Sequence, residues 1–262
     1  MKQNKIQFYK YHGTGNDFIM IDNRDFIFPK NDVKLIEHLC HRRFGIGADG
    51  LILLENDPDL DFKMTYFNSD GNESTMCGNG GRCLVAFAHF LGIFKDKCAF
   101  NAIDGIHEAE FKNGIVKLKM IPVEEITQNG KDFVLDTGSP HFVRFVDEVE
   151  NFEVYLNGKA IRYSDAFKKE GINVNFVERI SENQIFVRTY ERGVEDETYS
   201  CGTGVTASCL SVMSMEDISA LEVKTLGGNL KVYADKVKNG FENIWLEGPA
   251  IQSFEGSFNI EE

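Results

Sequence analysis

The chain contains the tetrapeptide Cys-Gly-polar-Gly twice, at residues 77–80 and 201–204. Two further markers recur at nearly the same spacing: a Thr-Gly pair ahead of an apolar run, and a Gly ahead of a strand-like segment. The recurring pairs are Cys77 and Cys201, Thr14 and Thr137, and Gly105 and Gly228, at offsets of 124, 123 and 123 residues. A constant offset is typical of a duplicated structural unit, so the sequence predicts two equivalent halves. Chance recurrence of Gly-rich turns among 24 glycines is the alternative.

Short β-branched and aromatic segments, separated by Gly, Asn and Asp, predict many strands. The predicted strands are 5–11, 18–22, 51–55, 62–67, 115–120, 132–136, 141–146, 172–177, 184–190, 221–225, 229–234 and 243–247. We therefore expect a mixed α/β (α+β) fold of two pseudo-symmetric domains, each a mixed, barrel-like β-sheet around one prominent helix.

Three helices are predicted. Residues 31–43 open at Asn31 or Asp32, a good cap, and place Val33, Ile36 and Leu39/Cys40 on one stripe. Residues 78–93 and 202–214 each begin directly after a cysteine of the repeated tetrapeptide. The prominent helix of each half is thus expected to start at Cys77 or Cys201.

Charge and hydropathy exclude several classes of protein. With 41 acidic against 28 basic residues the net charge is −13, and no Lys or Arg cluster suggests nucleic-acid binding. No apolar run approaches the roughly 20 residues of a membrane helix. The first residues lack the apolar core of a secretory signal, so a cytoplasmic location is expected.

The six cysteines do not form a metal motif, because no Cys-x-x-Cys occurs, and no metal site is expected. A cysteine chosen without context is usually a small buried apolar residue. Cys40, Cys83, Cys98 and Cys209 are interpreted in this way. The repeated tetrapeptide sets Cys77 and Cys201 apart from these four.

A cysteine at the start of a helix is a candidate thiolate, since the free N–H groups there attract anions. Two such helix ends would hold one carboxylate and place a sulfur on each side of its α-carbon. Inversion of that carbon needs a base on one face and an acid on the other. Cys77 and Cys201 are therefore predicted as the acid–base pair of a racemase or epimerase that uses neither metal nor pyridoxal phosphate.

Motifs along nearly the whole chain resemble the diaminopimelate epimerase family. They are KYHGTGNDF at 10–18, RFGIGADG at 43–50, FNSDG at 67–71, MCGNGGRC at 76–83, YERG at 190–193, SCGTG at 200–204 and LEGPA at 246–250. The resemblance implies two similar α/β halves, with the last strand returning to the first. The expected domains are 1-121 plus 249-262, carrying Cys77, and 122-248, carrying Cys201.

The resemblance also implies an activity: conversion of LL-diaminopimelate to meso-diaminopimelate for lysine and peptidoglycan synthesis, by a thiol and a thiolate without a cofactor. The partner is a small diamino diacid, and a homodimer stays open. The residues implied in substrate binding are Asn16, Asn68, Gly78, Asn79, Asn173, Glu191, Arg192, Gly202 and Thr203. Positions thought to adjust the protonation of the cysteines correspond to His141 and Glu191.

Ordinary structural roles are the alternative for these residues. Asn16, Asn68 and Asn173 suit turns or strand ends, Glu191 and Arg192 suit a solvated ion pair, and His141 suits a core or surface histidine.

The chain departs from the family pattern at two positions: Ser139 stands where Asn is common, and Gly50 where some members have Gln. Both changes bear on how the substrate is held and not on the reaction.

Three rival functions stay open. A proline or hydroxyproline racemase shares the two-cysteine logic, but its substrate lacks the second carboxylate that Arg192 would meet. An inactive binding protein would not need both cysteines. A thiol hydrolase would leave the second cysteine unexplained.

Overall fold

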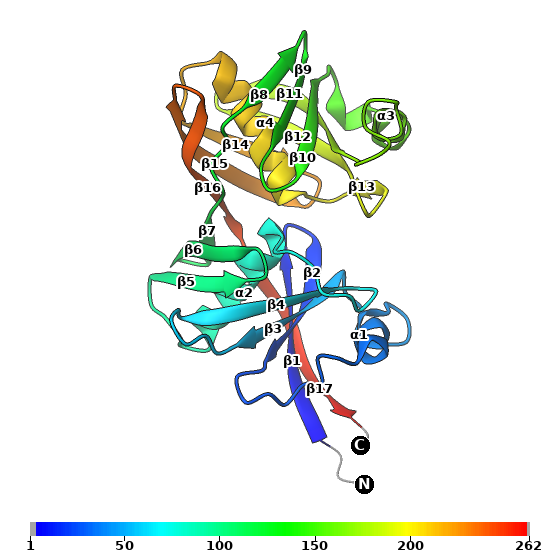
Figure 1. Ribbon diagram of the computed structural model, residues 1–262, viewed down its shortest axis with the longest axis vertical. Helices are drawn as coiled ribbons and strands as arrows, with labels where there is room; N and C mark the ends of the chain where they lie inside the picture. Colours follow the sequence, from blue (N-terminus) through cyan, green and yellow to red (C-terminus); the bar gives the residue numbers. More distant parts are fainter. Residues whose placement is uncertain (1–3, 261–262) are drawn as a thin grey trace. The chain divides into compact units, whose positions relative to one another are not determined.

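A computed structural model describes residues 4–260 (Figure 1). The chain divides into two compact units, Met1–Leu118 with Pro249–Glu262, and Lys119–Gly248. None of the helices in the described stretch is long and apolar enough to span a membrane.

The first unit is a mixed sheet with two helices. Its strands are β1 (Asn4–Gly13), β2 (Asn16–Asp22), β3 (Gly50–Glu55), β4 (Phe62–Asn68), β5 (Lys97–Ala102), β6 (Gly105–Lys112), β7 (Ile115–Lys119) and β17 (Ile251–Ile260), and its helices are α1 (Val33–Cys40) and α2 (Gly78–Phe90). The strand order is β17-β1-β2-β3-β4-β5-β6-β7; β2 and β3, and β4 and β5, pair in parallel and all others antiparallel. The last strand of the chain therefore pairs with the first.

The second unit is built in the same way. Its strands are β8 (Ile126–Asn129), β9 (Asp132–Asp136), β10 (Pro140–Phe145), β11 (Asn173–Ser181), β12 (Gln184–Glu191), β13 (Asp196–Thr198), β14 (Ala220–Thr225), β15 (Gly228–Val237) and β16 (Gly240–Pro249), and its helices are η1 (Val149–Asn151), α3 (Val154–Arg162) and α4 (Gly202–Met215). The order β8-β9-β10-β11-β12-β14-β15-β16 has parallel pairs at β10 with β11 and β12 with β14, and antiparallel pairs elsewhere.

The two units thus repeat one topology: β1 to β7 match β9, β10, β11, β12, β14, β15 and β16 in order, and the short strand β13 is an addition in the second unit. The repeated glycines lie in equivalent turns: Gly15 and Gly138 have φ of 90° and 98°, and Gly105 and Gly228 have φ of 123° and 143°. Side chains are strained at such angles, which explains why glycine recurs at these positions. The expected mixed, pseudo-symmetric α/β fold is confirmed.

Helices α2 and α4 are the central helices of their units. Eleven consecutive residues of α2, Gly78 to Ala88, are buried, and α4 is buried from Gly204 to Met213. A helix that is mostly apolar around its circumference can be buried on all sides, and its few polar side chains then need hydrogen-bond partners inside the protein. In the second unit α4 contacts β9 to β12, β14 and β15, and Figure 1 shows it among them.

All twelve predicted strands are present, and the three predicted helices occur as α1, α2 and α4. Asp32 caps α1 as expected, with its side chain accepting the N–H of Leu35 at 3.0 Å. Helix α1 buries Ile36, Leu39 and Cys40. Val33 is the exception to the predicted stripe: it is 44% exposed, because it lies in the first turn beside the cap.

Candidate active site

Cys77 is the N-cap of α2, and its Sγ accepts the backbone N–H of Gly80 at 3.2 Å. This is the place where Ser or Asp usually caps a helix. A Cβ at Gly80 would stand only 3.1 Å from this sulfur, so glycine leaves room for it. The first intrahelical bond runs from Gly81 N–H to the Cys77 carbonyl, so the N–H groups of Gly78 and Asn79 precede it.

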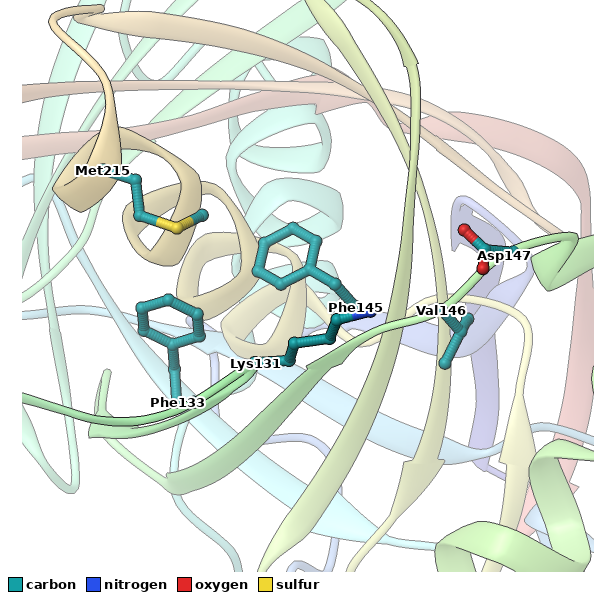
Figure 2. A pocket seen from close by; sticks show the side chains of 7 residues that line it. Lys131, Phe133, Phe145, Val146, Asp147 and Met215 are labelled. Atoms are coloured by element: carbon teal, nitrogen blue, oxygen red, sulfur yellow. The ribbon is translucent and has the colours of Figure 1, made fainter.

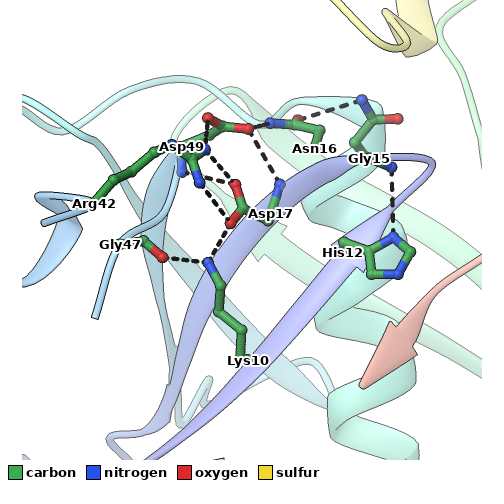
Figure 3. Close-up of polar contacts among 9 residues, drawn as sticks. Lys10, His12, Gly15, Asn16, Asp17, Arg42, Gly47 and Asp49 are labelled. Carbon is green, nitrogen blue, oxygen red and sulfur yellow. Dashed lines mark hydrogen bonds and ion pairs between the residues drawn. The ribbon is translucent and has the colours of Figure 1, made fainter. Parts of the chain in front are cut away.

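The side chains of Asn16 and Asn79 belong to one directed chain of hydrogen bonds. Asn79 Nδ2 donates to Asn16 Oδ1 at 3.3 Å. Asn16 Nδ2 in turn donates to Asp49 Oδ2 at 2.7 Å (Figure 3). At the other end Asn79 Oδ1 accepts from Arg82 at 3.0 Å. A carboxylate only accepts and a guanidinium only donates, so these two ends fix the orientation of both amides.

Charged residues behind Asn16 hold Asp49 in place. Arg42 pairs with both Asp17 and Asp49, and Lys10 pairs with Asp17 (Figure 3). Burial alone would raise the pKa of Asp17, but hydrogen bonds from Arg42 and Lys10 outweigh it and hold this pKa at about 2. Asp17 is therefore ionised near neutral pH, where it pairs with Arg42 and Lys10.

Asn68 lies at the exposed end of β4, opposite Gly50 in the β3–β4 pair. No side-chain hydrogen bond joins it to the Asn16–Asn79 chain within the described residues. At Gly50 a Cβ would stand 2.5 Å from the Phe67 carbonyl oxygen and 2.6 Å from the Tyr66 ring. This strand therefore has no room for the Gln that some family members carry.

Cys201 is the N-cap of α4, as Cys77 is of α2. Its Sγ lies 3.4 Å from Thr203 Oγ1, and the first helical bond runs from Val205 N–H to the Cys201 carbonyl. The N–H groups of Gly202 and Thr203 precede that bond. Thr137, from the turn between β9 and β10, donates to the Thr203 carbonyl at 3.0 Å and ties this helix start to the sheet.

Asn173, Ser139 and Arg192 form a second polar group in the same unit. Asn173 Oδ1 accepts the backbone N–H of Arg192 at 2.9 Å, and Asn173 Nδ2 donates to Ser139 Oγ at 2.9 Å. The Arg192 guanidinium also donates to Ser139 Oγ, at 3.2 Å. In the described part of the chain no carboxylate pairs with Arg192.

His141 is fully buried and neutral. Burial lowers its pKa to about 3, and the charge of Arg192 adds to that shift. Asn175 Nδ2 lies 3.2 Å from His141 Nδ1 and 3.0 Å from the Phe142 carbonyl, and Asn175 Oδ1 accepts from Thr189 at 2.9 Å. Because Asn175 donates, Nδ1 accepts, and the ring proton resides on Nε2.

Asn175 connects this buried group to the Cys201 helix. A Cβ at Gly204 would stand 2.3 Å from Asn175 Oδ1 and 3.4 Å from the Cys201 Cβ. Glycine is thus required where α4 meets β11. Sequence reasoning missed Asn175; the signal is the alternation of Asn173 and Asn175 with Val174 and Phe176, which belong to the apolar cluster on the other face.

Glu191 is half-buried at the end of β12, and its Oε2 accepts a hydrogen bond from Thr198 Oγ1 of β13 at 2.8 Å. The next residue, Arg192, pairs with Asn173 and Ser139.

The four remaining cysteines have environments unsuited to reaction. Burial raises the pKa of the Cys40 and Cys98 thiols to about 12, and shifts Cys83 and Cys209 in the same direction. These thiols stay protonated near neutral pH and act as packing residues.

One cavity in the second unit, of about 240 Å³, is lined by Phe133, Phe145, Val146 and Met215 among others (Figure 2). Met215 ends α4, while Cys201 begins it, so roughly 20 Å of helix separates the cavity from the sulfur. This cavity is not part of the candidate site. Within residues 4–260 no group of three or more His, Cys, Asp or Glu side chains is arranged to hold a metal ion.

The fold defines the class of protein. A PhzF-family phenazine biosynthesis protein from Bacillus anthracis superposes with a TM-score of 0.78 at 14% identity, covering 98% of this chain and 100% of that one. A hydroxyproline epimerase from Agrobacterium vitis superposes with a TM-score of 0.67 at 14% identity, covering 99% and 92%. The chain thus has the two-domain fold shared by PhzF proteins and amino-acid epimerases.

Sequence similarity gives the family within that class. The diaminopimelate epimerase family model matches residues 8–124 and 133–250. A diaminopimelate epimerase from Flavobacterium psychrophilum is 54% identical over 253 residues, covering 95% of this chain and 99% of the relative. One from Aquifex aeolicus is 38% identical over 275 residues, covering 98% and 99%. The chain belongs to the diaminopimelate epimerase family and is an isomerase, which confirms the resemblance found in its motifs.

Proposed function

We propose that this chain interconverts LL- and meso-diaminopimelate by moving protons between Cys77 and Cys201 at the substrate's α-carbon. The matched pair of cysteine-capped helices is the observation that carries the proposal. Residues 1-121 plus 249-262 supply one sulfur, and 122-248 supply the other. Family membership supports the choice of substrate.

In the proposed reaction the thiolate of one cysteine removes the α-proton, and the thiol of the other donates its proton to the opposite face. The first sulfur ends as a thiol and the second as a thiolate, so the reverse reaction starts from the product state. The α-proton is a very weak acid, and the carbanion needs electrostatic support. The first-turn N–H groups of Gly78, Asn79, Gly202 and Thr203 supply it by binding the α-carboxylate.

The remaining predicted residues are assigned to binding. Asn16 Oδ1 is oriented as an acceptor, which suits the substrate's ammonium group. Arg192, held by Ser139 and the Glu170 carbonyl, suits the distant carboxylate, and Asn173 and Asn68 are proposed to bind the same end of the substrate. His141 and Glu191 are proposed to adjust the protonation of the cysteines. His141 would do so as a neutral imidazole.

Isotope incorporation tests the two-base step. LL-Diaminopimelate in D₂O is followed by NMR at early times. Two monoprotic bases predict deuterium at the inverted carbon of the product, while the remaining LL-substrate still carries protium. Early deuterium in the LL-substrate itself would point to a single exchanging base and contradict the mechanism.

The cysteines are tested by substitution. Cys77→Ala and Cys201→Ala should each lower kcat by at least about 10²–10⁴, the usual contribution of a general acid or base. Cys83→Ala and Cys209→Ala, further along the same helices, are the matched controls and should keep activity. Near-normal turnover in either Cys77→Ala or Cys201→Ala would disprove the assignment, and activity on proline with none on diaminopimelate would disprove the substrate.

The proposal includes a cytoplasmic site of action, because the six described cysteines are all free thiols and the reaction needs two of them reduced. A homodimer is an open part of the proposal, and sedimentation equilibrium measures it directly.

A further inference from the structure

Arg82 is a fully buried guanidinium in the first half of α2, and the proposed reaction does not yet use it. It has no exposed surface and is the largest completely buried side chain in the described structure. Burial lowers its pKa to about 10, with the thiols Cys83 and Cys77 acting in the opposite direction. Arg82 is therefore still positively charged near neutral pH.

Within residues 4–260 the groups that accept hydrogen bonds from Arg82 are neutral. Its Nη1 donates to the Gly78 carbonyl at 3.1 Å, and its Nη2 donates to Asn79 Oδ1 at 3.0 Å and Thr14 Oγ1 at 3.3 Å. Its Nε has no hydrogen-bond partner. Among residues 4–260 no Asp or Glu carboxylate pairs with it. A buried charge without a counter-ion is costly, so an anion that is not a carboxylate of this chain is expected nearby.

Several charged groups on the elements around α2 are already paired with one another. Lys10 of β1 pairs with Asp17 of β2, and Glu55 of β3 pairs with Lys30. At the start of β6, Asp104 Oδ1 lies 3.3 Å from His107 Nε2, and the same carboxylate also accepts the N–H of Met76 next to Cys77. Asp104 therefore opposes negative charge at Cys77, and a counter-charge is the more necessary there.

The position of Arg82 indicates which anion it would stabilise, the thiolate of Cys77. Its guanidinium binds Gly78 and Asn79, the two residues that follow Cys77. A Cβ at Gly13 would stand 3.0 Å from the Asn79 carbonyl oxygen and 3.3 Å from Arg82 Nη2, so glycine in β1 lets the guanidinium reach this site. The nearby Cys83 is fully buried and held as a thiol by that burial.

We propose that Arg82 is a positioning residue and the buried counter-charge of the amino end of α2. It stabilises the thiolate of Cys77 and fixes the Asn79 amide that orients Asn16. When Cys77 gains the substrate's proton, the same charge favours the negative charge that moves to the substrate carboxylate. This inference rests on the proposed function for its use in catalysis, but its electrostatic part does not.

The electrostatic part is tested on the thiol itself. The rate of alkylation of Cys77 by iodoacetamide is measured against pH, with peptide mass spectrometry to read Cys77 alone. In the wild type the midpoint should lie below the ordinary thiol value of about 8.5. Arg82→Met should raise it by about one unit or more, as expected when a close opposite charge is removed. Arg82→Lys keeps the charge and should stay close to the wild type.

Arg24→Met is the matched control, since Arg24 belongs to the same unit and pairs with Asp22 at the surface. It should leave the Cys77 midpoint unchanged. Arg82→Met and Arg82→Lys both lose the planar guanidinium that holds Asn79, so both should lower kcat/KM. The effect of the charge is therefore read from the Cys77 midpoint, which should differ between the two variants. Circular dichroism establishes that each variant is folded.

Two results would overturn the inference: a folded Arg82→Met variant with an unchanged midpoint, or, if that variant does not fold, a wild-type midpoint at or above the ordinary value. Deuterium incorporation is read separately. A midpoint that depends on Arg82 in an enzyme that fails the two-base test leaves the inference standing and the function wrong. The reverse pair of results leaves the function standing and removes Arg82 from it.

Discussion

His141 and Arg82 are basic residues with no exposed surface, yet they differ in charge near neutral pH. Burial lowers the pKa of His141 to about 3 and that of Arg82 to about 10. The same desolvation therefore neutralises the imidazole, whose ordinary pKa is 6.5, and leaves the guanidinium charged. A buried His is suited to directed hydrogen bonding, and a buried Arg to holding an anion.

The buried His141 predicts a specific loss of stability in acid. The unfolded chain takes up a proton at the histidine near pH 6.5, whereas the folded protein does not until about pH 3. Stability is therefore complete above pH 6.5 and falls as the pH drops through this window, by up to about 1.4 kcal/mol per pH unit. Urea unfolding between about pH 4.5 and 6 measures this slope.

His141→Gln should flatten the slope, because glutamine does not titrate and its oxygen can still accept from Asn175. His38→Gln, at an exposed position of α1, is the control and should keep the wild-type slope. An equal slope in His141→Gln would mean that another group titrates in this window. The carboxylate of Asp17, with its pKa held at about 2, acts only at lower pH.

Arg192 is predicted to determine how well the substrate's distant carboxylate is bound. Its guanidinium is already held by Ser139 and the Glu170 carbonyl, so little freedom is lost on binding. Arg192→Lys should reduce kcat/KM for diaminopimelate at least about tenfold, since an ammonium cannot form two parallel bonds. Arg144→Lys, at a partly exposed Asp132 pair, should have little effect on steady-state kinetics. Equal losses in both variants would contradict the assignment.

At this scale the sequence indicated the cysteines and their flanking residues, because a short repeated motif contains them. It did not indicate Asp49, Arg82 or Asn175 as members of the site. Each has a partner far away in the sequence. Asp49 is bound by Asn16, 33 residues away, and Asn175 by His141, 34 residues away. Arg82 reaches Thr14, 68 residues away, as well as two residues of its own helix. Such contacts depend on strand pairing, which a motif does not contain.

At the level of elements, the packing of α4 on β11 depends on Gly204. A Cβ there would stand 2.3 Å from Asn175 Oδ1, well inside contact distance. Gly204→Ala should lower the free energy of unfolding by about 1–3 kcal/mol and displace the helix start that carries Cys201, with a loss of kcat. Thermal unfolding and steady-state kinetics measure the two effects.

The double variant Gly204→Ala/Asn175→Ala separates the steric contact with Asn175 from the change in helix propensity between Gly and Ala. Removing the Asn175 amide should recover part of the lost packing, so the two stability losses should not add. Full additivity would show that the Gly204 effect does not pass through Asn175. Gly80→Ala in α2 is the comparison. A Cβ there would stand 3.1 Å from its nearest neighbours, so the loss of stability should be smaller than in Gly204→Ala.

The missed elements have physical reasons. Helix α3 contains Gly158, which disfavours a helix by roughly 1 kcal/mol, but a Cβ there would stand 2.4 Å from the Tyr190 Cβ. Strand β6 buries His107 and Ala109 and leaves Ile106 69% exposed, so its apolar residues lie on the wrong face for the usual pattern. Strand β17 has no fully buried residue, and Gly256 interrupts its alternate apolar positions Phe254, Phe258 and Ile260. In all three segments the secondary structure is determined by tertiary contacts and not by the local preference of the residues.

At the level of the whole molecule, the pairing of β17 with β1 closes the first unit. Lys5 to Lys10 of β1 pair with Phe254 to Asn259 of β17, and Gly256 leaves space for the Phe8 ring. Deleting residues 251–262 should expose Ile6 and Phe8, lower the melting temperature and abolish epimerisation. Deleting only 261–262 is the control. Calorimetry measures the transitions, and an unchanged melting temperature after the longer deletion would contradict this role.

The same pairing determines when the first unit can finish folding during translation. Translation makes β1 first and its partner β17 last, and at roughly 5–20 residues per second the intervening chain takes on the order of 10–50 s to emerge. The uninterrupted segment Lys119–Gly248 is complete before β17 exists. Throughout that interval the nascent first half has an open sheet edge beside Ile6 and Phe8, the surface that holdase chaperones bind and that aggregates seed from. This sheet edge of the first unit stays unpaired, and prone to aggregation, until β17 has been synthesised and pairs with β1.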